Sequence, residues 1–264
     1  MKNIIVKEIN AAAAIAGREL LRFIKNPLFL ILNLTFPVVF IGLFGGGISQ
    51  NLSAGLPYDV MQFVLLGMAA ALLYQSAMSG VISLMEDRET DFTQEIFVAP
   101  ISRYTIIIGK VFGAMLISLV SLVSIFLVAI VMRISLTWAD VGHILVVAPL
   151  IALSGAALGV FFIGLVNDPK TVGMSSFLLI FPQFFICGAI IPVIHSSGIL
   201  KFLASIFPMT YVIDLMRGVF YHGKPVYNAI VVHSPWFNLV VTLTFGLFFV
   251  VVGTLLFARS ERNK

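Results

Sequence analysis

The chain has 264 residues, of which 60% are hydrophobic and only 11% are charged. A soluble domain is about a quarter charged, so this composition excludes an ordinary soluble protein and indicates one embedded in a membrane. The net charge of +4 gives no reason to expect nucleic acid as a partner. The single cysteine, Cys187, excludes an intrachain disulfide and is expected to be a packing residue within its apolar run.

Charged residues divide the chain into apolar stretches long enough to cross a membrane. A bilayer core about 30 Å thick requires roughly 20 apolar residues of helix. Six stretches meet this requirement: 28–48, 60–84, a third from near Tyr104 to Arg133, 141–166, 171–191 and 236–258. The predicted fold is therefore an all-α integral membrane protein with six transmembrane helices. An even number of spans places both termini on the same side.

Basic residues are unevenly divided between the two sets of connecting segments. With both termini inside, only four of the sixteen fall on outer segments, namely Arg133, Lys201, Arg217 and Lys224. Cytoplasmic segments of membrane proteins carry the excess of lysine and arginine. We therefore expect a multi-pass protein of the plasma or inner membrane with both termini in the cytoplasm.

The segment before the first span is basic and amphipathic. Three cations lie among its apolar residues: Arg18, Arg22 and Lys25. Asn26-Pro27 ends the helical pattern and turns the chain into the membrane. Residues 1–27 are predicted to form a cytoplasmic N-terminus with an interfacial helix along the inner membrane surface. A simple basic anchor that sets the topology is the alternative.

The connection between the fifth and sixth predicted spans is too apolar for a solvated loop. Its two helical patterns, GILKFLASIF and MTYVIDLMRGVF, are each too short to cross a bilayer. We expect residues 192–222 to enter the outer leaflet as two short helices and return. Asp214 and Arg217 lie three residues apart, so they are predicted to form a structural ion pair. A role in an ion path is the alternative.

The connection between the second and third spans, residues 85–103, holds five of the twelve acidic residues. It is longer than a turn between antiparallel helices requires, and apolar residues stand among its charges. A short amphipathic helix of this kind fits a groove on a soluble partner; a solvated loop is the alternative on composition alone. The candidate contact residues are Glu86, Asp87, Arg88, Glu89, Asp91, Glu95, Ile96, Phe97, Val98 and Pro100.

Two motifs carry a resemblance to a known family. EDRETDFTQEIFVAPISRYTIIIGKVFGAML, residues 86–116, resembles the hallmark of the type-2 permease family of ABC transporters, in which an acidic-Arg-Glu run leads into an apolar stretch, a proline and Gly-Lys. FPMTYVIDLMRGVFY, residues 207–221, resembles the second hallmark of that family. Asp91-Phe92 departs from the Gly-Thr that the family commonly has there.

The resemblance implies the transmembrane permease subunit of an ABC exporter. Such a subunit works as a dimer, with a second copy of itself or a homologous permease, and with two cytoplasmic ATPase subunits that hold ATP and Mg²⁺. No cofactor is implied on this chain. The helix before the first span would be the connecting helix, residues 86–101 the coupling helix, and residues 198–221 the re-entrant helices.

Neither an ATP-binding nor a catalytic motif accompanies these features. Gly109-Lys110 lacks the flanking residues of a phosphate-binding loop, and the four histidines are scattered without metal-ligand spacing. Catalytic and metal-binding residues are therefore not predicted. A membrane-embedded enzyme is the alternative from a different class of function.

The sequence says less about the substrate. Phe181, Phe184 and Phe185 flank Pro182 in the fifth span and are candidates for an apolar pathway wall. Together with the family resemblance they favour outward transport of a hydrophobic or amphipathic compound, drug-like or lipid, by alternating access. Polysaccharide or glycolipid export is the alternative within the family. The permease domain is expected over residues 28–258, followed by a cytoplasmic tail, 259–264.

Overall fold

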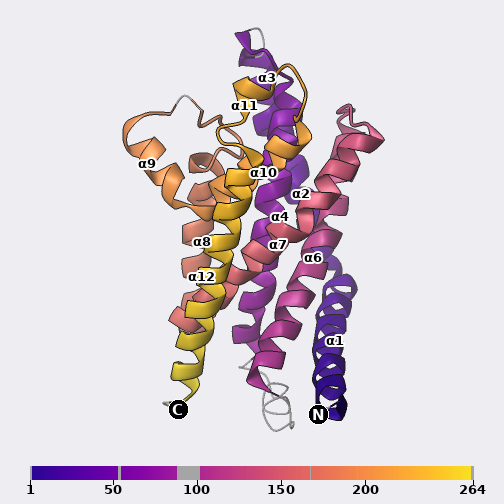
Figure 1. Ribbon diagram of the computed structural model, residues 1–264. Helices are drawn as coiled ribbons and strands as arrows, with labels where there is room; N and C mark the ends of the chain where they lie inside the picture. The colour runs from indigo at the N-terminus through magenta and orange to yellow at the C-terminus, as the bar shows by residue number, and fades with distance from the viewer. Residues whose placement is uncertain (1, 53–54, 88–101, 167, 195, 263–264) are drawn as a thin grey trace.

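The structure is a computed structural model that describes residues 2–52, 55–87, 102–166, 168–194 and 196–262. Within these residues every regular element is helical. The helices form an elongated bundle, and α1 begins at the same end of the bundle at which α12 finishes (Figure 1). We call this the terminal end. The bounds are α1 Lys2–Lys25, α2 Pro27–Phe40, the π-helical turn η1 Ile41–Gly45, α3 Gly46–Leu52, α4 Val60–Asp87, α6 Arg103–Val131, α7 Trp138–Leu165, α8 Pro169–Ile186, α9 Gly198–Ile206, α10 Pro208–Phe220, α11 Tyr227–Ile230 and α12 Pro235–Arg262.

Five helical stretches among the described residues are long and apolar enough to cross a membrane, or six if the bent pair α9–α10 counts as one. These stretches are Leu30–Gln50, Val60–Met85, Tyr104–Val131, Trp138–Leu165 and Pro235–Leu256. They coincide with five of the six predicted spans, so the prediction of a multi-pass, all-α membrane protein is confirmed.

The predicted fifth span, 171–191, is shorter in the structure. Helix α8 has 18 residues, which makes it about 27 Å long, and its apolar part is only Met174–Ile186. The chain leaves the helix because Gly188 adopts a positive φ of 88°, a conformation that suits glycine and ends a helix. The predicted C-terminal end of this span, residue 191, was therefore wrong by several residues.

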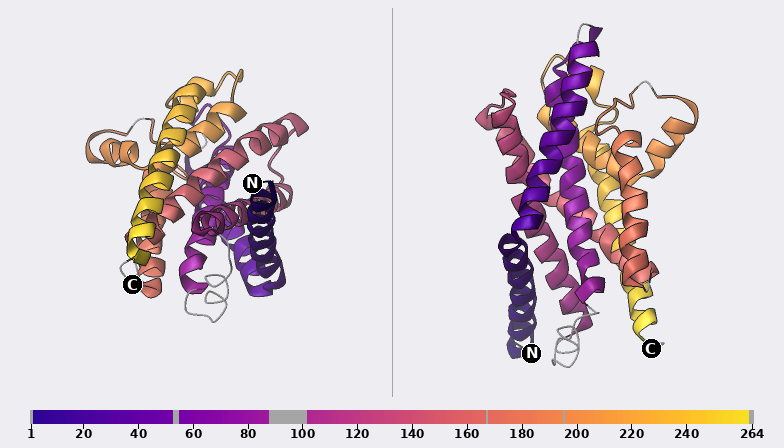
Figure 2. Two further views of the ribbon diagram at one scale, coloured as in Figure 1. Left: turned by 60° about the horizontal axis from the view of Figure 1, so that its bottom comes forward. Right: turned by 180° about the vertical axis from the view of Figure 1, so that it is seen from behind.

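The connection that follows α8 contains the two short helices that the sequence predicted. α9 and α10 meet at an angle of 86° around Phe207. Pro208 occupies the first position of α10, where its missing N–H costs least. Both helices lie at the end of the bundle opposite the termini (Figures 1 and 2). A bent pair of this kind is either a broken span or a re-entrant loop.

Helix α1 is longer than the predicted interfacial helix and lies against α6 (Figure 2). The contact is close because α6 presents Gly109 and Gly113 to α1: an added Cβ on Gly109 would meet Ile15, and one on Gly113 would meet Glu19. Small residues permit such close approach between helices. Part of the apolar face expected to lie on the membrane surface is thus covered by protein, whereas Leu21 remains exposed.

The glycines of the fourth predicted span also serve packing within the chain. In α7, Gly155 lies against the backbone of Tyr74 in α4, so an added Cβ would collide with the Tyr74 carbonyl. Gly164, near the end of the same helix, lies against Gly253 of α12. α7 therefore occupies the centre of the bundle between α4 and α12, as their extensive contacts also show.

Candidate functional site

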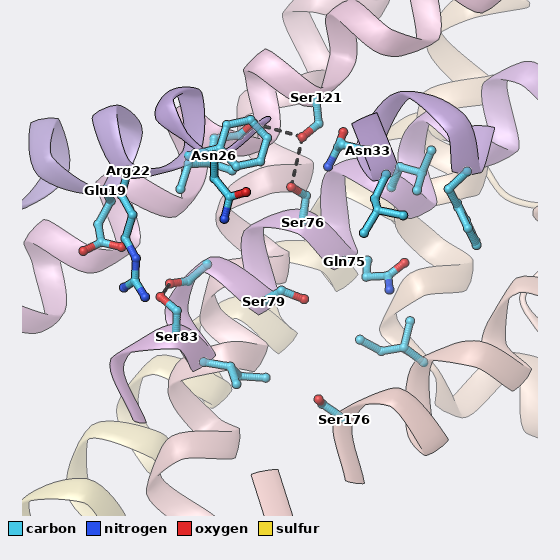
Figure 3. Close-up of a pocket in the computed structure, with 18 residues that line it drawn as sticks. Glu19, Arg22, Asn26, Asn33, Gln75, Ser76, Ser79, Ser83, Ser121 and Ser176 are labelled. Carbon is cyan, nitrogen blue, oxygen red and sulfur yellow. Dashed lines mark hydrogen bonds between the residues drawn. The ribbon is translucent and has the colours of Figure 1, made fainter. Parts of the chain in front are cut away.

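A cavity of about 520 Å³ lies among helices α1, α2, α4, α6 and α8 (Figure 3). Hydroxyl groups supply much of its polar lining: Ser76, Ser79, Ser83, Ser121 and Ser176. Side-chain amides come from Asn26, Asn33 and Gln75, and both charged lining residues, Glu19 and Arg22, lie on α1. Apolar side chains complete the wall, among them Leu32, Phe36, Leu72 and Ile180. The cavity is thus amphipathic, and α2, α4 and α6 of its wall belong to apolar stretches long enough to cross a membrane.

Helix α4 has two faces of opposite character. Ser76, Ser79 and Ser83 follow one another at intervals of three and four residues, which places them on one side of the helix. This side faces the cavity. Tyr74 and Met78 are fully buried on the side that packs against Gly155 and Gly159 of α7. α7 thus fixes the orientation of α4 and directs its serines into the cavity.

Several hydroxyls of the lining already have partners within the chain. Ser121 Oγ donates to the Ile117 carbonyl and lies 3.1 Å from Ser76 Oγ. Ser83 Oγ donates to the Gly80 carbonyl at 2.8 Å. These bonds satisfy polar groups that would otherwise be costly in an apolar environment.

Three other polar side chains of the lining differ in this respect. Within the described part of the chain, Asn33, Gln75 and Ser79 form no side-chain hydrogen bond, and the Gln75 Oε1 atom is buried without a partner. Figure 3 shows Gln75 and Ser79 on α4, with Asn33 on α2 and Ser176 on α8 lying on either side of them. The cavity therefore contains uncharged hydrogen-bonding groups that the described residues leave without partners.

A buried ion pair borders the cavity. Glu19 Oε1 of α1 lies 3.0 Å from Lys110 Nζ of α6, and these side chains are 4% and 1% exposed. Lys110 also donates to Ser83 Oγ at 3.3 Å, and Arg18 Nη1 donates to Glu19 Oε1 at 3.2 Å. This charge cluster joins three helices at the edge of the cavity.

A second acid of α1 holds the start of α6. The Glu8 carboxylate accepts hydrogen bonds from the Ser102 backbone N–H, at 3.2 Å from Oε2, and from the Thr105 hydroxyl. Ser102 is the N-cap of α6 and the first described residue after segment 88–101 of the acidic connection. Glu8 therefore attaches α1 to the point at which that connection rejoins the bundle.

Most of the predicted contact segment lies outside the described residues. Glu86 and Asp87 fall in the last turn of α4. The remaining candidates, Arg88, Glu89, Asp91, Glu95, Ile96, Phe97, Val98 and Pro100, belong to the segment 88–101 that the structure does not describe. Their role in contacting an ATPase stays a prediction.

The predicted cations of the interfacial helix have separate positions. Arg18 contacts Glu19, Arg22 lines the cavity, and Lys25 is exposed at the end of α1. Only Arg22 therefore borders the candidate site directly.

Asp214 and Arg217 do not form the ion pair that the sequence predicted. The Asp214 carboxylate instead accepts hydrogen bonds from the backbone N–H groups of Val232 and His233, at 2.9 and 2.7 Å, and from Asn238 Nδ2 at 2.8 Å. These donors lie just before and at the start of α12. Asp214 therefore joins α10 to α12, which explains why an acid is buried there.

Arg217 points to a different group of acceptors. Its guanidinium donates to the carbonyls of Gly188, Ala189 and Phe63 at 2.7, 3.1 and 3.0 Å and lies 3.5 Å from the centroid of the Phe63 ring. It thereby connects α10 with α4 and with the segment that ends α8. The planar guanidinium donates to several carbonyls at once. These hydrogen bonds take the place of the predicted ion pair with Asp214.

The three phenylalanines proposed for a pathway wall mainly join α8 to the first span. Phe184 is 1% exposed, and its ring centroid lies 5.9 Å from that of Phe36. Phe185 lies 5.8 Å from Phe44 and 5.9 Å from Phe181. The α8 residues that line the cavity are instead Ser176 and Ile180. A pathway role for Phe181, Phe184 and Phe185 remains a prediction.

The residues that give the cavity its polar character were not predicted from the sequence. The three serines of α4 were visible as a period of three to four within the second span, whereas Glu8, Glu19 and Gln75 carry no comparable local signal. Among the described residues, no cluster of histidine, cysteine and carboxylate side chains could hold a metal ion. Cys187 is buried and has a free thiol, as expected for a packing residue.

A multi-pass helical bundle with an amphipathic cavity among its spans has the architecture of a transporter membrane domain. The family model described as ABC-2 type transporter matches residues 10–221. The chain therefore belongs to the ABC-2 type transporter family, as the two motifs indicated. It is the transmembrane permease subunit, which lacks an ATPase site, and the family works with ABC ATPase partners. No curated protein matches the chain.

Proposed function

We propose that this permease subunit exports a hydrophobic or amphipathic compound, drug-like or lipid, by alternating access. In this proposal two permease chains, identical or homologous, assemble in the plasma or inner membrane with two cytoplasmic ATPase subunits. Both termini lie in the cytoplasm, and ATP and Mg²⁺ bind to the ATPases. The family match supports the role of a permease subunit, whereas the cavity and the contacts of α1 support the proposed substrate class and coupling.

The amphipathic cavity is the observation that carries the substrate assignment. Its volume of about 520 Å³ falls within the range of about 300–1,000 Å³ typical of small-molecule sites. Its lining combines an aliphatic and aromatic wall with hydroxyl and amide groups. A bare ion would require a more uniformly polar or charged set of ligands, so the lining favours an amphipath.

The contacts of α1 support a coupling role for the acidic connection. Segment 88–101 ends next to Ser102, which Glu8 binds, and Glu19 of the same helix borders the cavity. In the proposed mechanism the segment docks on the ATPase, and α1 and α6 transmit its movement to the cavity. Phe97 supplies a buried anchor in this interface, with acids such as Asp91 at the rim.

The test is ATP-driven transport by a reconstituted complex. The permease is co-expressed with candidate ABC ATPases, purified and placed in vesicles, and movement of a fluorescent amphipath is followed with ATP and with a non-hydrolysable analogue. Phe97→Ala should weaken assembly by about 2 kcal/mol or more, as expected for a desolvated anchor. Asp91→Ala is the matched control and should cost roughly 0–1 kcal/mol.

Two results would contradict the proposal. One is normal assembly and ATP-coupled transport by the Phe97→Ala variant, which would remove the docking role of segment 88–101. The other is robust ATP hydrolysis by the purified permease alone, which would show an enzymatic site on this chain.

A further inference from the structure

The unpartnered polar groups of the cavity define the kind of head group it can hold. Asn33 comes from α2, whereas Gln75 and Ser79 come from α4, and all three line the same cavity. Within the described residues their side chains form no hydrogen bond, and Gln75 Oε1 is buried without a partner. A buried polar atom without a partner is costly, so a ligand that donates a hydrogen bond to Gln75 Oε1 removes that cost. Asn33 and Ser79 are more accessible and offer further hydrogen bonds to the same ligand.

The chemistry of these three residues is uncharged. A side-chain amide donates through its NH₂ group and accepts through its oxygen, and a hydroxyl can do both. A sugar or polyol hydroxyl is also both donor and acceptor and so matches them. A quaternary ammonium group can do neither, and a sulfate can only accept. The lining therefore favours a hydroxyl-bearing, uncharged head group.

The charged residues of the lining lie at one side of the cavity: Figure 3 shows Glu19 and Arg22 together, away from Asn33 and Gln75. Glu19 and Arg22 both belong to α1, and the Glu19 carboxylate is already bonded to Lys110 and Arg18. It is therefore a weak attractor for a cationic ligand. Asn33, Gln75 and Ser79 lie on other helices, beside the apolar side chains of Leu32 and Leu72.

We infer that the cavity binds an uncharged amphiphile whose hydroxylated head group contacts Asn33, Gln75 and Ser79, while its alkyl chain packs against the apolar wall. This inference rests on the proposed function, because it names the substrate class of the same cavity. It narrows a broad hydrophobic or amphipathic class to one with a neutral, hydroxyl-rich head.

The inference is tested by ligand protection of a cysteine in the cavity, without ATP or ATPase. The full chain, in phosphatidylcholine nanodiscs, carries Cys187→Ala and the reporter Leu72→Cys, and its reaction with N-ethylmaleimide is timed. Octyl glucoside, octyl sulfate and octyltrimethylammonium share one chain length and differ only in the head group. The glucoside should slow labelling severalfold, and the two charged amphiphiles should change it little.

Two matched variants locate the effect. Gln75→Leu in the reporter background should weaken protection by octyl glucoside about fivefold to tenfold, as expected for the loss of hydrogen bonds in a desolvated site. A reporter at Ser205→Cys, which is exposed on α9 outside the cavity, should label at the same rate with and without each amphiphile.

The remaining outcomes overturn the inference. Equal or stronger protection by either charged amphiphile shows that the cavity does not select a neutral head group. Absence of protection by all three shows that these amphiphiles do not occupy the cavity. Both results can occur in a chain that assembles with an ATPase and transports, so they are distinguishable from failure of the proposed function, which is scored by ATP dependence.

Discussion

Lys110 Nζ lies 3.0 Å from Glu19 Oε1 where neither side chain is more than 4% exposed. The pair joins α1 to α6, and through Ser83 it also reaches α4. A buried pair of this kind adds little net stability over an apolar pair, but removing one partner leaves an uncompensated buried charge. Its value to the protein is therefore the specific relation it imposes between α1 and α6.

Removing one charge of this pair should be destabilising. Lys110→Met is expected to lower the free energy of unfolding by about 1–3 kcal/mol, because buried Glu19 would lose Lys110 but keep the partly exposed Arg18 as a cationic partner. Glu19→Gln combined with Lys110→Met should cost less than the sum of the single variants. Thermal unfolding of the purified variants checks this, with exposed Lys25→Met as the control. Additive losses would show that the two residues act independently.

The close approach of α4 and α7 gives a packing prediction. Gly155→Val places side-chain atoms against the Tyr74 backbone, so this variant should lose folded yield and melt at a clearly lower temperature. Gly142→Val, in the same helix, is the matched control, because an added Cβ at this position meets nothing within 4 Å. Similar behaviour of the two variants would argue against tight α4–α7 packing.

Replacing the Asp214 carboxylate should lower the stability of the protein, and asparagine should preserve more of that stability than alanine. Asp214→Ala leaves the N–H groups of Val232 and His233 without their acceptor, at a cost of about 1–3 kcal/mol for each group that stays buried and unsatisfied. Asp214→Asn retains one acceptor oxygen and should be intermediate. The measurement is thermal unfolding, supported by proteolysis of the segment before α12. Equal stability of the Ala and Asn variants would contradict this role.

Arg217 should not be replaceable by lysine. A lysine side chain at this position would keep the positive charge but cannot satisfy three carbonyls and stack on Phe63 at once. We therefore expect Arg217→Lys to be destabilised almost as much as Arg217→Met, as measured by thermal unfolding. Full recovery of stability in the lysine variant would show that charge alone is sufficient at this position.

Topology gives a prediction that is independent of the substrate. Ser135→Cys, exposed in the connection after α6, should react with an impermeant thiol reagent added to intact cells. Asp91→Cys should react only after permeabilisation, because the basic segments place it inside. Labelling of Asp91→Cys from outside would reverse the orientation.

The sequence predicted the spans well because their limits are local. Charged residues or turns border α4, α6, α7 and α12, and the apolar runs between them are long enough to cross a bilayer. The end of α8 was missed because it depends on the positive φ of Gly188 and on Arg217, which binds two carbonyls there from a distant helix. That interaction is tertiary and leaves no local pattern.

The candidate site was less accessible to sequence reasoning. The i, i+3 spacing of Asp214 and Arg217 permitted a pair, but acceptors and donors elsewhere in the chain determined the contacts. In the sequence, Glu19 is one of several charged residues of an amphipathic helix. Its burial depends on contact with α6, which the sequence does not reveal. The serines of α4 had a readable period, but only the arrangement of five helices shows that they face a cavity.

The two acids of α1 have a mechanical consequence. Glu8 and Glu19 are eleven positions apart, about 16 Å along the helix axis, and they grip different turns of α6. Because these two attachments hold α1 at separate points along α6, we expect α1 and the first turns of α6 to move as one rigid unit. Asn26 is the one residue between α1 and α2 outside a helix, and it lines the cavity. A displacement of Ser102 would therefore rotate α1 about Asn26, at the wall of the cavity.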